Sequence, residues 1–487
     1  MRVRSVSPGT PPSQTTPPSG QQPASRGTRK PERSASRAPA STRETWPGGI
    51  TRKKIDPYYD KALQMLEGSR YPYETNPYYK QTPKTKACIE AFDSLAPSEE
   101  TISTPEREFP HLAVRFAGDF PGAQSKNNQG VIQSSCTKCG ECDIGCNIHA
   151  KNTLDLNYIA RAENQERLGN TGKAATIKTH ALVYDIEPLT KGGFIVRYRN
   201  PQKNEQETGE ISAEKVILSA GSYGSTGLLL KLQAKGRLPN ISSQLGRQWA
   251  GNGDLEGTIL DIPKEVYPTL GPVITTALKY RFKPYPDGFP HGLYIQEGGF
   301  PSLIAWYLTG KAPSPSAFVN AIKFAVKTVK RFLGKDKEIR IGDDVLSMLD
   351  SDDFLRRSMV LLGMGRDRST GRLFLNENDK IELKWKLKEG SKYHIDHARN
   401  EMARLAGAMG GKFMVNPITY FNKVIAVHPL GGCVMADGAE EGVVDTTGEV
   451  FGYPGLHVVD ASILPSSTGV NPSLTIAAVA EMISERF

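Results

Sequence analysis

Short apolar runs near the C-terminus predict strands that end at polar residues. Val424 to Val427 is apolar and mostly β-branched, so we expect a strand that delivers His428 at its end. Leu456 to Val459 predicts a second, buried strand with Asp460 at its C-terminal tip. Because α/β sheets bind ligands beyond the carboxyl ends of their strands, both polar residues are candidates for contact with a ligand.

The last apolar segment, Ser473 to Ile483, predicts a helix. Asn471 is expected to be its N-cap, and Pro472 to occupy the first helical position. The free amide groups at a helix start carry a partial positive charge, which stabilises a negative oxygen or an anionic ring. The C-terminal sequence therefore places an imidazole and a carboxamide beside a helix start.

Another helical pattern lies in the middle of the chain, where apolar residues recur at helical spacing opposite basic ones. The apolar residues are Phe318, Ile322, Val326, Val329 and Leu333, and the basic residues are Lys323, Lys327, Lys330 and Arg331. Two interpretations stay open. We favour a core-facing helix with a solvated basic face over a basic amphipathic helix that touches a membrane surface transiently.

Residues 1–45 differ in composition from the rest of the chain. They contain eight Pro, many Ser and Thr, and almost no large apolar side chains. Such a segment cannot bury enough surface to offset chain entropy, so it should be disordered. It also carries eight Lys or Arg against two Glu, which is most of the net charge of +9 of the whole chain. We therefore expect no nucleic-acid partner, which would need a clustered basic face on the folded part.

The sequence shows no apolar run of the length of a membrane span, and its N-terminus has no apolar core of a secretory signal. We therefore expect a soluble protein, with a cytoplasmic location favoured.

Two C-terminal motifs carry a family resemblance. The motifs His428-Pro-Leu-Gly-Gly-Cys433 and Gly469-Val-Asn-Pro472 resemble those of the glucose-methanol-choline (GMC) flavoprotein oxidoreductases, and among them the cholesterol oxidase branch. Further segments similar to this family are Trp46 to Ile50, Asp56 to Tyr59, Thr179 to Ile186, Ala213 to Thr226, Leu238 to Asn240 and Gly246 to Gly253. The resemblance runs from about residue 46 to the C-terminus and is weakest between about 258 and 410.

The resemblance implies an FAD-dependent enzyme that removes hydride from a CH–OH group. His428 would take the hydroxyl proton as a base, and Asn471 would hold the substrate oxygen or polarise the flavin. The residues expected to contact FAD are Asn152, Val183, Ala220, Gly221, Gly224, Asp460, Gly469, Asn471 and Pro472. The expected substrate is a bulky hydrophobic alcohol such as a sterol, and the acceptor is dioxygen or an electron carrier.

The implied fold class is α/β, with a GMC-type FAD-binding domain that is incomplete at its N-terminus and an inserted α+β substrate or cap domain with a mixed sheet. We assign residues 1–45 to the tail, 46–257 to the FAD domain with its Cys-rich loop, 258–410 to the cap, and 411–487 to the C-terminal part of the FAD domain. The aromatic residues that would face an apolar substrate from the cap are Trp306, Tyr307, Phe318, Phe324 and Phe332.

The sequence departs from the family pattern where the FAD pyrophosphate should bind. Family members begin with a strand and a Gly-x-Gly-x-x-Gly helix start, whose amide groups hold the pyrophosphate. This chain has no such motif, and Gly251-x-Gly253 and Gly363-x-Gly365 lack the third Gly at the right spacing. Two explanations compete: a genuine tail on a non-catalytic relative with poor FAD binding, or an N-terminal third lost through a wrong start or a frame change. We favour the second.

Four of the six cysteines form the run Cys136-x-x-Cys139-x-x-Cys142-x-x-x-Cys146. This is the spacing of bacterial ferredoxin ligands, so one alternative is an iron–sulfur cluster in an electron-transfer flavoprotein dehydrogenase. Because the fourth Cys of such a run binds the other cluster in two-cluster ferredoxins, a single cluster would need Cys146 in a strained loop, or a remote thiol such as Cys88 or Cys433. A zinc ion held by the four thiolates is another alternative. The favoured interpretation is a metal-free loop beside the flavin.

Overall fold

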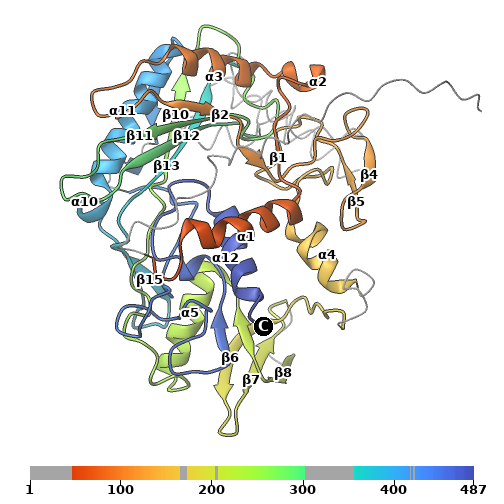
Figure 1. Cartoon of the computed structure of the whole chain (residues 1–487), viewed down its shortest axis with the longest axis vertical. Helices are drawn as coiled ribbons and strands as arrows, with labels where there is room; N and C mark the ends of the chain where they lie inside the picture. The colour runs from red at the N-terminus through yellow and green to blue at the C-terminus, as the bar shows by residue number, and fades with distance from the viewer. Residues whose placement is uncertain (1–45, 165–172, 203–206, 302–355, 417, 420–422) are drawn as a thin grey trace, which may run out of the picture. The chain divides into compact units, whose positions relative to one another are not determined.

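A six-stranded sheet with the order β16-β10-β13-β12-β11-β2 dominates one part of the structure (Figure 1), and each neighbouring pair is antiparallel. Its strands are β2 (Glu106–Glu108), β10 (Leu255–Leu260), β11 (Ala277–Arg281), β12 (Gly292–Gly298), β13 (Met359–Gly365) and β16 (Lys412–Val415). Among the described residues this sheet is therefore antiparallel, and not the mixed sheet predicted for the cap. A short connection joins β11 to β12, which suits antiparallel neighbours, whereas parallel strands need a longer crossover.

The computed structural model describes residues 46–164, 173–202, 207–301, 356–416, 418–419 and 423–487. All of them lie in one compact unit. The tail of residues 1–45, the predicted helix of residues 318–333 and the predicted aromatic residues of the cap lie outside the described residues.

Two helices, α3 (Pro83–Ser94) and α11 (Lys392–Ala408), contact each other and pack on this sheet (Figure 1). Apolar side chains of both helices and of the strands form one buried cluster. A Cβ atom at Gly363 would collide with Met402, and one at Gly365 with His394, so these glycines allow α11 to approach β13 closely. This packing explains the Gly363-x-Gly365 pattern without a phosphate.

A second group of elements surrounds the helix α5. An antiparallel three-stranded sheet, a parallel pair of strands and three helices share a buried apolar cluster. They are β6 (Leu182–Pro188), β7 (Phe194–Arg199), β8 (Thr208–Ala213), β9 (Val216–Leu218), β17 (Leu456–Val458), α1 (Arg52–Met65), α5 (Gly221–Ala234) and α12 (Ser473–Ser484). The parallel pair β17-β9 confirms the buried strand predicted for Leu456 to Val459. α1 packs on α12, and the Tyr59 hydroxyl lies 2.8 Å from the hydroxyl of Thr475.

The remaining elements are short. They are β1 (Ser69–Arg70), β3 (His111–Leu112), β4 (Gln124–Lys126), β5 (Ile132–Ser134), β14 (Arg372–Leu375), β15 (Ile381–Lys384), α2 (Pro77–Lys80), α4 (Tyr158–Glu163), α10 (Leu387–Gly390), and the 3₁₀ turns η1 (Leu154–Leu156) and η4 (Ala461–Ile463).

Two local predictions near the C-terminus are wrong. Val424 to Val427 is not a strand, because the backbone N–H groups of Val427 and His428 donate to the carboxylate of Asp254 instead of to a neighbouring strand. Asn471 does not cap α12: Pro472 occupies the N-cap position, and the Asn471 side chain bonds to Gln296. The predicted helix itself is confirmed as α12 (Ser473–Ser484), and only the roles of Asn471 and Pro472 at its start differ from the prediction.

The described residues combine helices with sheets, which agrees with the predicted α/β class at this general level. The domain boundaries stay predictions. The predicted boundary between residues 257 and 258 falls inside β10. The six-stranded sheet also takes β2 and β16 from outside residues 258–410. Among the helices described, none has the length and apolar character to cross a membrane.

Candidate active site

His428 forms a hydrogen-bonded pair with Asp254, which immediately precedes β10. The ring Nδ1 lies 2.8 Å from Oδ1 of Asp254, and Oδ2 accepts the backbone N–H groups of Val427 and His428 at 2.7 and 2.8 Å. The side chain of Asp254 is 3% exposed, and that of His428 is 21% exposed. Because the carboxylate of Asp254 can only accept a hydrogen bond, we assign a proton to Nδ1 of His428. Nε2 is then the nitrogen that can take a proton from a ligand.

The segment Asn252 to Asp254 joins His428 to the loop that precedes α12. Asn252 is buried and has a φ of 56°, a left-handed conformation that Asn tolerates. Its Oδ1 accepts the backbone N–H of Thr468 at 2.9 Å, and its Nδ2 donates to the carbonyl of Val470 at 2.9 Å. Since Asp254 holds His428 and Asn252 holds residues 468–470, this one short segment positions both predicted catalytic regions.

Asn471 is held by the central sheet. Its Oδ1 accepts a hydrogen bond of 2.9 Å from Nε2 of Gln296, which lies on β12. This bond orients the carboxamide and leaves its Nδ2 group as a donor toward a ligand.

An aromatic group lies beside the Asn252–Asp254 segment. The rings of Tyr223 and Trp249 are 6.5 Å apart, and those of Trp249 and Trp385 are 5.1 Å apart, both edge to face. A Cβ atom at Gly251 would lie 3.2 Å from Ala426 and 3.4 Å from Trp385, so this glycine packs directly against the group. We call Tyr223, Trp249 and Trp385 the aromatic wall. It packs beside the backbone that leads to Asp254.

Asp460 fixes the start of α5. Its Oδ2 accepts the backbone N–H of Gly221 at 2.9 Å and the hydroxyl of Ser225, and its Oδ1 accepts the N–H and the hydroxyl of Ser462 at 2.7 and 2.6 Å. The carboxylate therefore occupies the positive end of α5. The predicted FAD contacts Ala220, Gly221 and Gly224 lie at this helix start, where Ala220 and Gly224 are exposed.

The Gly-Gly turn after His428 packs against the chain itself. Gly431 and Gly432 have φ values of 77° and 108°. A Cβ atom on Gly431 would collide with the carbonyl of Gln248, and one on Gly432 with the side chain of Thr226. Glycine is therefore needed here for close packing between this turn, α5 and the segment before β10.

The other predicted cofactor contacts are spread over several elements. Val183 is half-buried on β6 and packs against the core around α5. Gly469 has a φ of 75° and donates its N–H to Asn252 at 3.2 Å, and Pro472 is buried at the start of α12. Gly469 and Pro472 thus flank Asn471 in the candidate site.

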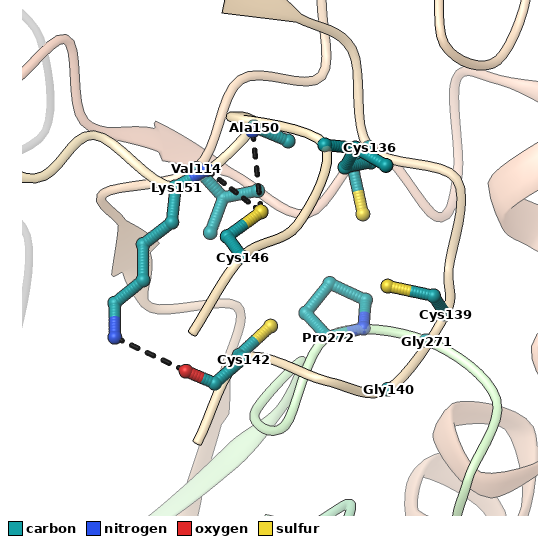
Figure 2. A pocket seen from close by; sticks show the side chains of 11 residues that line it. Val114, Cys136, Cys139, Gly140, Cys142, Cys146, Ala150, Lys151, Gly271 and Pro272 are labelled. Atoms are coloured by element: carbon teal, nitrogen blue, oxygen red, sulfur yellow. Dashed lines mark hydrogen bonds between the residues drawn. The ribbon is translucent and has the colours of Figure 1, made fainter. Parts of the chain in front are cut away.

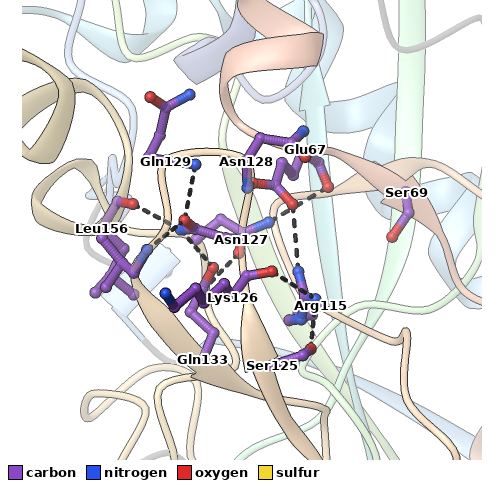
Figure 3. A network of polar contacts seen from close by, with 12 residues as sticks. Glu67, Ser69, Arg115, Ser125, Lys126, Asn127, Asn128, Gln129, Gln133 and Leu156 are labelled. Carbon is purple, nitrogen blue, oxygen red and sulfur yellow. Dashed lines mark hydrogen bonds and ion pairs between the residues drawn. The ribbon is translucent and has the colours of Figure 1, made fainter. Parts of the chain in front are cut away.

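Asn152 is bonded to Gln133, which belongs to a polar network with Asn127 (Figure 3). Asn127 donates to Oε1 of Gln133 at 2.9 Å, and Nε2 of Gln133 donates to Oδ1 of Asn152 at 2.9 Å. The Nδ2 group of Asn152 donates to the carbonyl of Leu66 at 2.8 Å. Asn152 also lines a pocket of about 410 Å³ together with Arg115. These bonds fix its side chain at the edge of that pocket.

The cysteine run folds into one loop whose four sulfur atoms face a common space (Figure 2). Cys136, Cys139, Cys142 and Cys146 all line the same pocket, together with Val114, Ile148, Ala150 and Pro272. All four are free thiols. In the part of the chain that the structure describes, no group of three or more His, Cys, Asp or Glu side chains is arranged to hold a single metal ion.

Sequence reasoning missed Asp254, Asn252 and Gln296 as site residues. The segment Gly246 to Gly253 pointed to this region, but it ended one residue before Asp254. Gln296 is one of several polar residues in a strand pattern, and only its bond to Asn471 distinguishes it.

Comparison with known proteins gives a consistent set of relatives. Residues 367–480 match the family model described as GMC oxidoreductase. A cholesterol oxidase of Acinetobacter baumannii is 29% identical over 376 residues, which cover 73% of this chain and 61% of that protein. A cholesterol oxidase of Mycobacterium tuberculosis is 25% identical over 449 residues, which cover 88% of this chain and 71% of that protein. The chain thus spans about three fifths of the Acinetobacter relative.

Among solved structures, pyridoxine 4-oxidase from Mesorbium loti is 16% identical, with a TM-score of 0.44 over 85% of this chain and 70% of that one.

Proposed function

We propose that this chain, whose residues 367–480 are a GMC oxidoreductase C-terminal domain and whose homologues include cholesterol oxidases, is part of an FAD-dependent enzyme that oxidises a bulky hydrophobic alcohol. The observation that carries the proposal is the pair His428–Asp254, held by the same short segment as the Asn471 loop. It provides a base at His428 and holds the loop that carries the hydrogen-bond donor Asn471.

The two residues have separate roles in the proposed reaction. Nε2 of His428 takes the proton of the hydroxyl group, and Asp254 stabilises the positive charge that the ring gains. The Nδ2 group of Asn471 donates to the oxygen of the substrate, and Gln296 keeps that group oriented. FAD, when bound, supplies the acceptor for the hydride.

The described residues fit the flavin end of FAD. α12 begins without a side-chain cap, so its first amide groups remain donors that can stabilise an anionic ring. Gly469, Asn471 and Pro472 would hold the ring there, and Ala220, Gly221 and Gly224 would contact the cofactor at the start of α5. The sequence has no Gly-x-Gly-x-x-Gly motif for the pyrophosphate, so the proposal assigns no residue to it.

The hydrophobic substrate is proposed from the aromatic wall. Tyr223 is 41% exposed beside Trp249, and Val427, next to His428, is 53% exposed. A large apolar alcohol would cover these side chains, which is the main favourable contribution to binding such a ligand. A sterol is one such alcohol, and dioxygen or an electron carrier would reoxidise the flavin.

A second candidate function is that of a non-catalytic homologue with poor FAD binding. The missing Gly-rich motif favours it, since that motif supplies the amide donors for the pyrophosphate. Among the strands of the described residues, parallel pairing is confined to β9 and β17. The two candidates differ in one measurable property, the affinity for FAD.

Mixing the FAD-loaded chain with a hydrophobic alcohol in the absence of oxygen should bleach the flavin absorption. Asn471→Leu should slow this reduction by about 10²-fold, because it removes one donor to the substrate oxygen. Stopped-flow absorption measures both rates. Asn378→Leu, an exposed Asn in the turn between β14 and β15, is the matched control and should reduce at the wild-type rate. No binding of FAD would support the second candidate. Reduction of Asn471→Leu at the wild-type rate would show that Asn471 has no role in the reaction.

Asp254→Asn should lower turnover by about 10²- to 10⁴-fold. An Asn side chain can still accept the N–H groups of Val427 and His428, but it no longer stabilises the charged ring of His428 or fixes its tautomer. Steady-state rates and thermal unfolding measured on the same sample separate this effect from misfolding. Asp261→Asn, an exposed Asp paired with Lys412, is the control, and equal rates in both variants would contradict the role of Asp254.

A further inference from the structure

The loop of residues 136–146 brings four thiols together in a way that the proposed alcohol oxidation does not use. In Figure 2 the side chains of Cys136, Cys139, Cys142 and Cys146 converge from different sides of the loop. All four line one pocket. Cys146 therefore faces the same space as the first three cysteines of the run, which the spacing alone left open.

Backbone N–H groups point at three of the four sulfur atoms. The N–H of Lys138 donates to Cys136 Sγ at 3.4 Å, and that of Ala150 donates to Cys146 Sγ at 3.2 Å. A backbone hydrogen bond from Val273 reaches Cys142. Such donors stabilise sulfur atoms that carry negative charge, and hydrogen bonds to the sulfurs tune protein-bound iron–sulfur clusters.

The backbone near the four cysteines contains several residues with positive φ. Lys138, Gly140, Gly145 and His149 have φ values of 61°, 74°, 104° and 57°. Such conformations are costly for the non-glycine residues, so the surrounding structure has to hold them. The loop is anchored by the N–H of Gly271, which donates to the carbonyl of Lys138 at 3.0 Å. A Cβ atom at Gly140 would collide with the carbonyl of Thr269.

The two remaining cysteines are engaged elsewhere. Cys88 is fully buried on α3, where its sulfur lies 3.3 Å from that of Met359. Cys433 is fully buried, and its sulfur lies 3.3 Å from the hydroxyl of Thr226. Neither lines the pocket. The run thus supplies a complete set of four thiols without a remote ligand.

The lining of the pocket is otherwise largely apolar. Side chains of Val114, Ile148 and Pro272 line it together with the four cysteines.

We propose that Cys136, Cys139, Cys142 and Cys146 bind a [4Fe–4S] cluster. Four thiolates are the ligand set of such a cluster, and each binds a different iron atom, so the sulfur atoms stand further apart than around one ion. A zinc ion would instead need all four sulfurs about 2.3 Å from a single point. The proposal concerns this loop alone and does not depend on the proposed alcohol oxidation.

Anaerobic reconstitution of the full chain with ferrous iron and sulfide tests the proposal. About four iron and four sulfide per chain are expected, with a broad visible absorption that dithionite bleaches. Cys139→Ser should lose most of the iron and the absorption. Cys139 is the exposed member of the set, so this variant keeps the buried packing of the loop. Cys88→Ala removes a thiol outside the pocket and should retain the wild-type iron content.

The readouts are iron, sulfide and zinc contents, and they do not require FAD or turnover. Iron and sulfide contents near zero in the reconstituted wild type would overturn the proposal. The same holds for equal iron contents in the wild type and Cys139→Ser, and for about one zinc per chain without sulfide. If Cys139→Ser fails to fold, Cys146→Ser provides the same comparison on the other side of the loop.

Discussion

Replacement of His428 by Gln is expected to lower turnover of the alcohol by about 10²- to 10⁴-fold, with folding and FAD binding retained. Gln can still donate a hydrogen bond to Asp254, so the contact that holds residues 427 and 428 persists. Its amide cannot take the hydroxyl proton, however, because a carboxamide is not a base near neutral pH. Steady-state turnover and the flavin content of the same sample measure the two effects.

The matched control is His180→Gln. His180 is exposed and lies before β6, so this variant should turn over at the wild-type rate. Wild-type turnover in His428→Gln would show that another group takes the proton. Loss of flavin together with turnover would assign His428 a role in cofactor binding instead.

Lys84→Met is expected to destabilise the fold by about 3–5 kcal/mol. Lys84 on α3 and Glu297 on β12 form an ion pair of 2.9 Å in which both side chains are 0% exposed. Glu297 also accepts the backbone N–H groups of Thr275 and Thr276 at 2.7 and 2.8 Å. Removal of the ammonium leaves a buried carboxylate without its partner charge, which costs more than the pair contributed. Urea unfolding followed by circular dichroism measures the change.

The control lies two residues away on the same helix. Lys86 pairs with Glu90 at 4.0 Å on the surface, and Lys86→Met should change stability by less than about 1 kcal/mol. A double variant, Lys84→Met with Glu297→Gln, should recover part of the loss because it removes the unpaired charge. Equal effects of Lys84→Met and Lys86→Met would contradict a special role of the buried pair.

The buried pair also bears on the candidate site. Glu297 is the neighbour of Gln296 on β12, and Gln296 orients the carboxamide of Asn471. We therefore expect Lys84→Met to weaken this orientation as well, although Lys84 contacts no proposed ligand.

The sequence was informative where local motifs carry the chemistry. The His428 motif and the Asn471 motif were found from the order of their residues, and the buried strand before Asp460 was found from its apolar run. The run of four cysteines was equally visible. In each case a short stretch of chain specifies the local conformation, so a pattern of residues is enough to identify it.

Local patterns failed where partners come from elsewhere in the chain. The apolar run at 424–427 has the composition of a strand, but its backbone N–H groups are taken by Asp254, more than 170 residues earlier. Asn is a residue type that N-caps favour, but the side-chain oxygen of Asn471 accepts a hydrogen bond from Gln296 on β12. A hydrogen bond to a distant residue outweighs a weak local preference, and no window of sequence contains both partners.

The sequence by itself determined which residues of this protein are candidates for chemistry: the imidazole of His428, the carboxamide of Asn471 and the four thiols of residues 136–146. Only the tertiary structure decided how they are held. Asn252 and Asp254 join two distant loops, Gln296 fixes the orientation of Asn471, and one pocket gathers all four sulfurs. The physical reason is that side-chain identity is local, whereas the partner of a hydrogen bond is set by how sheets and helices pack.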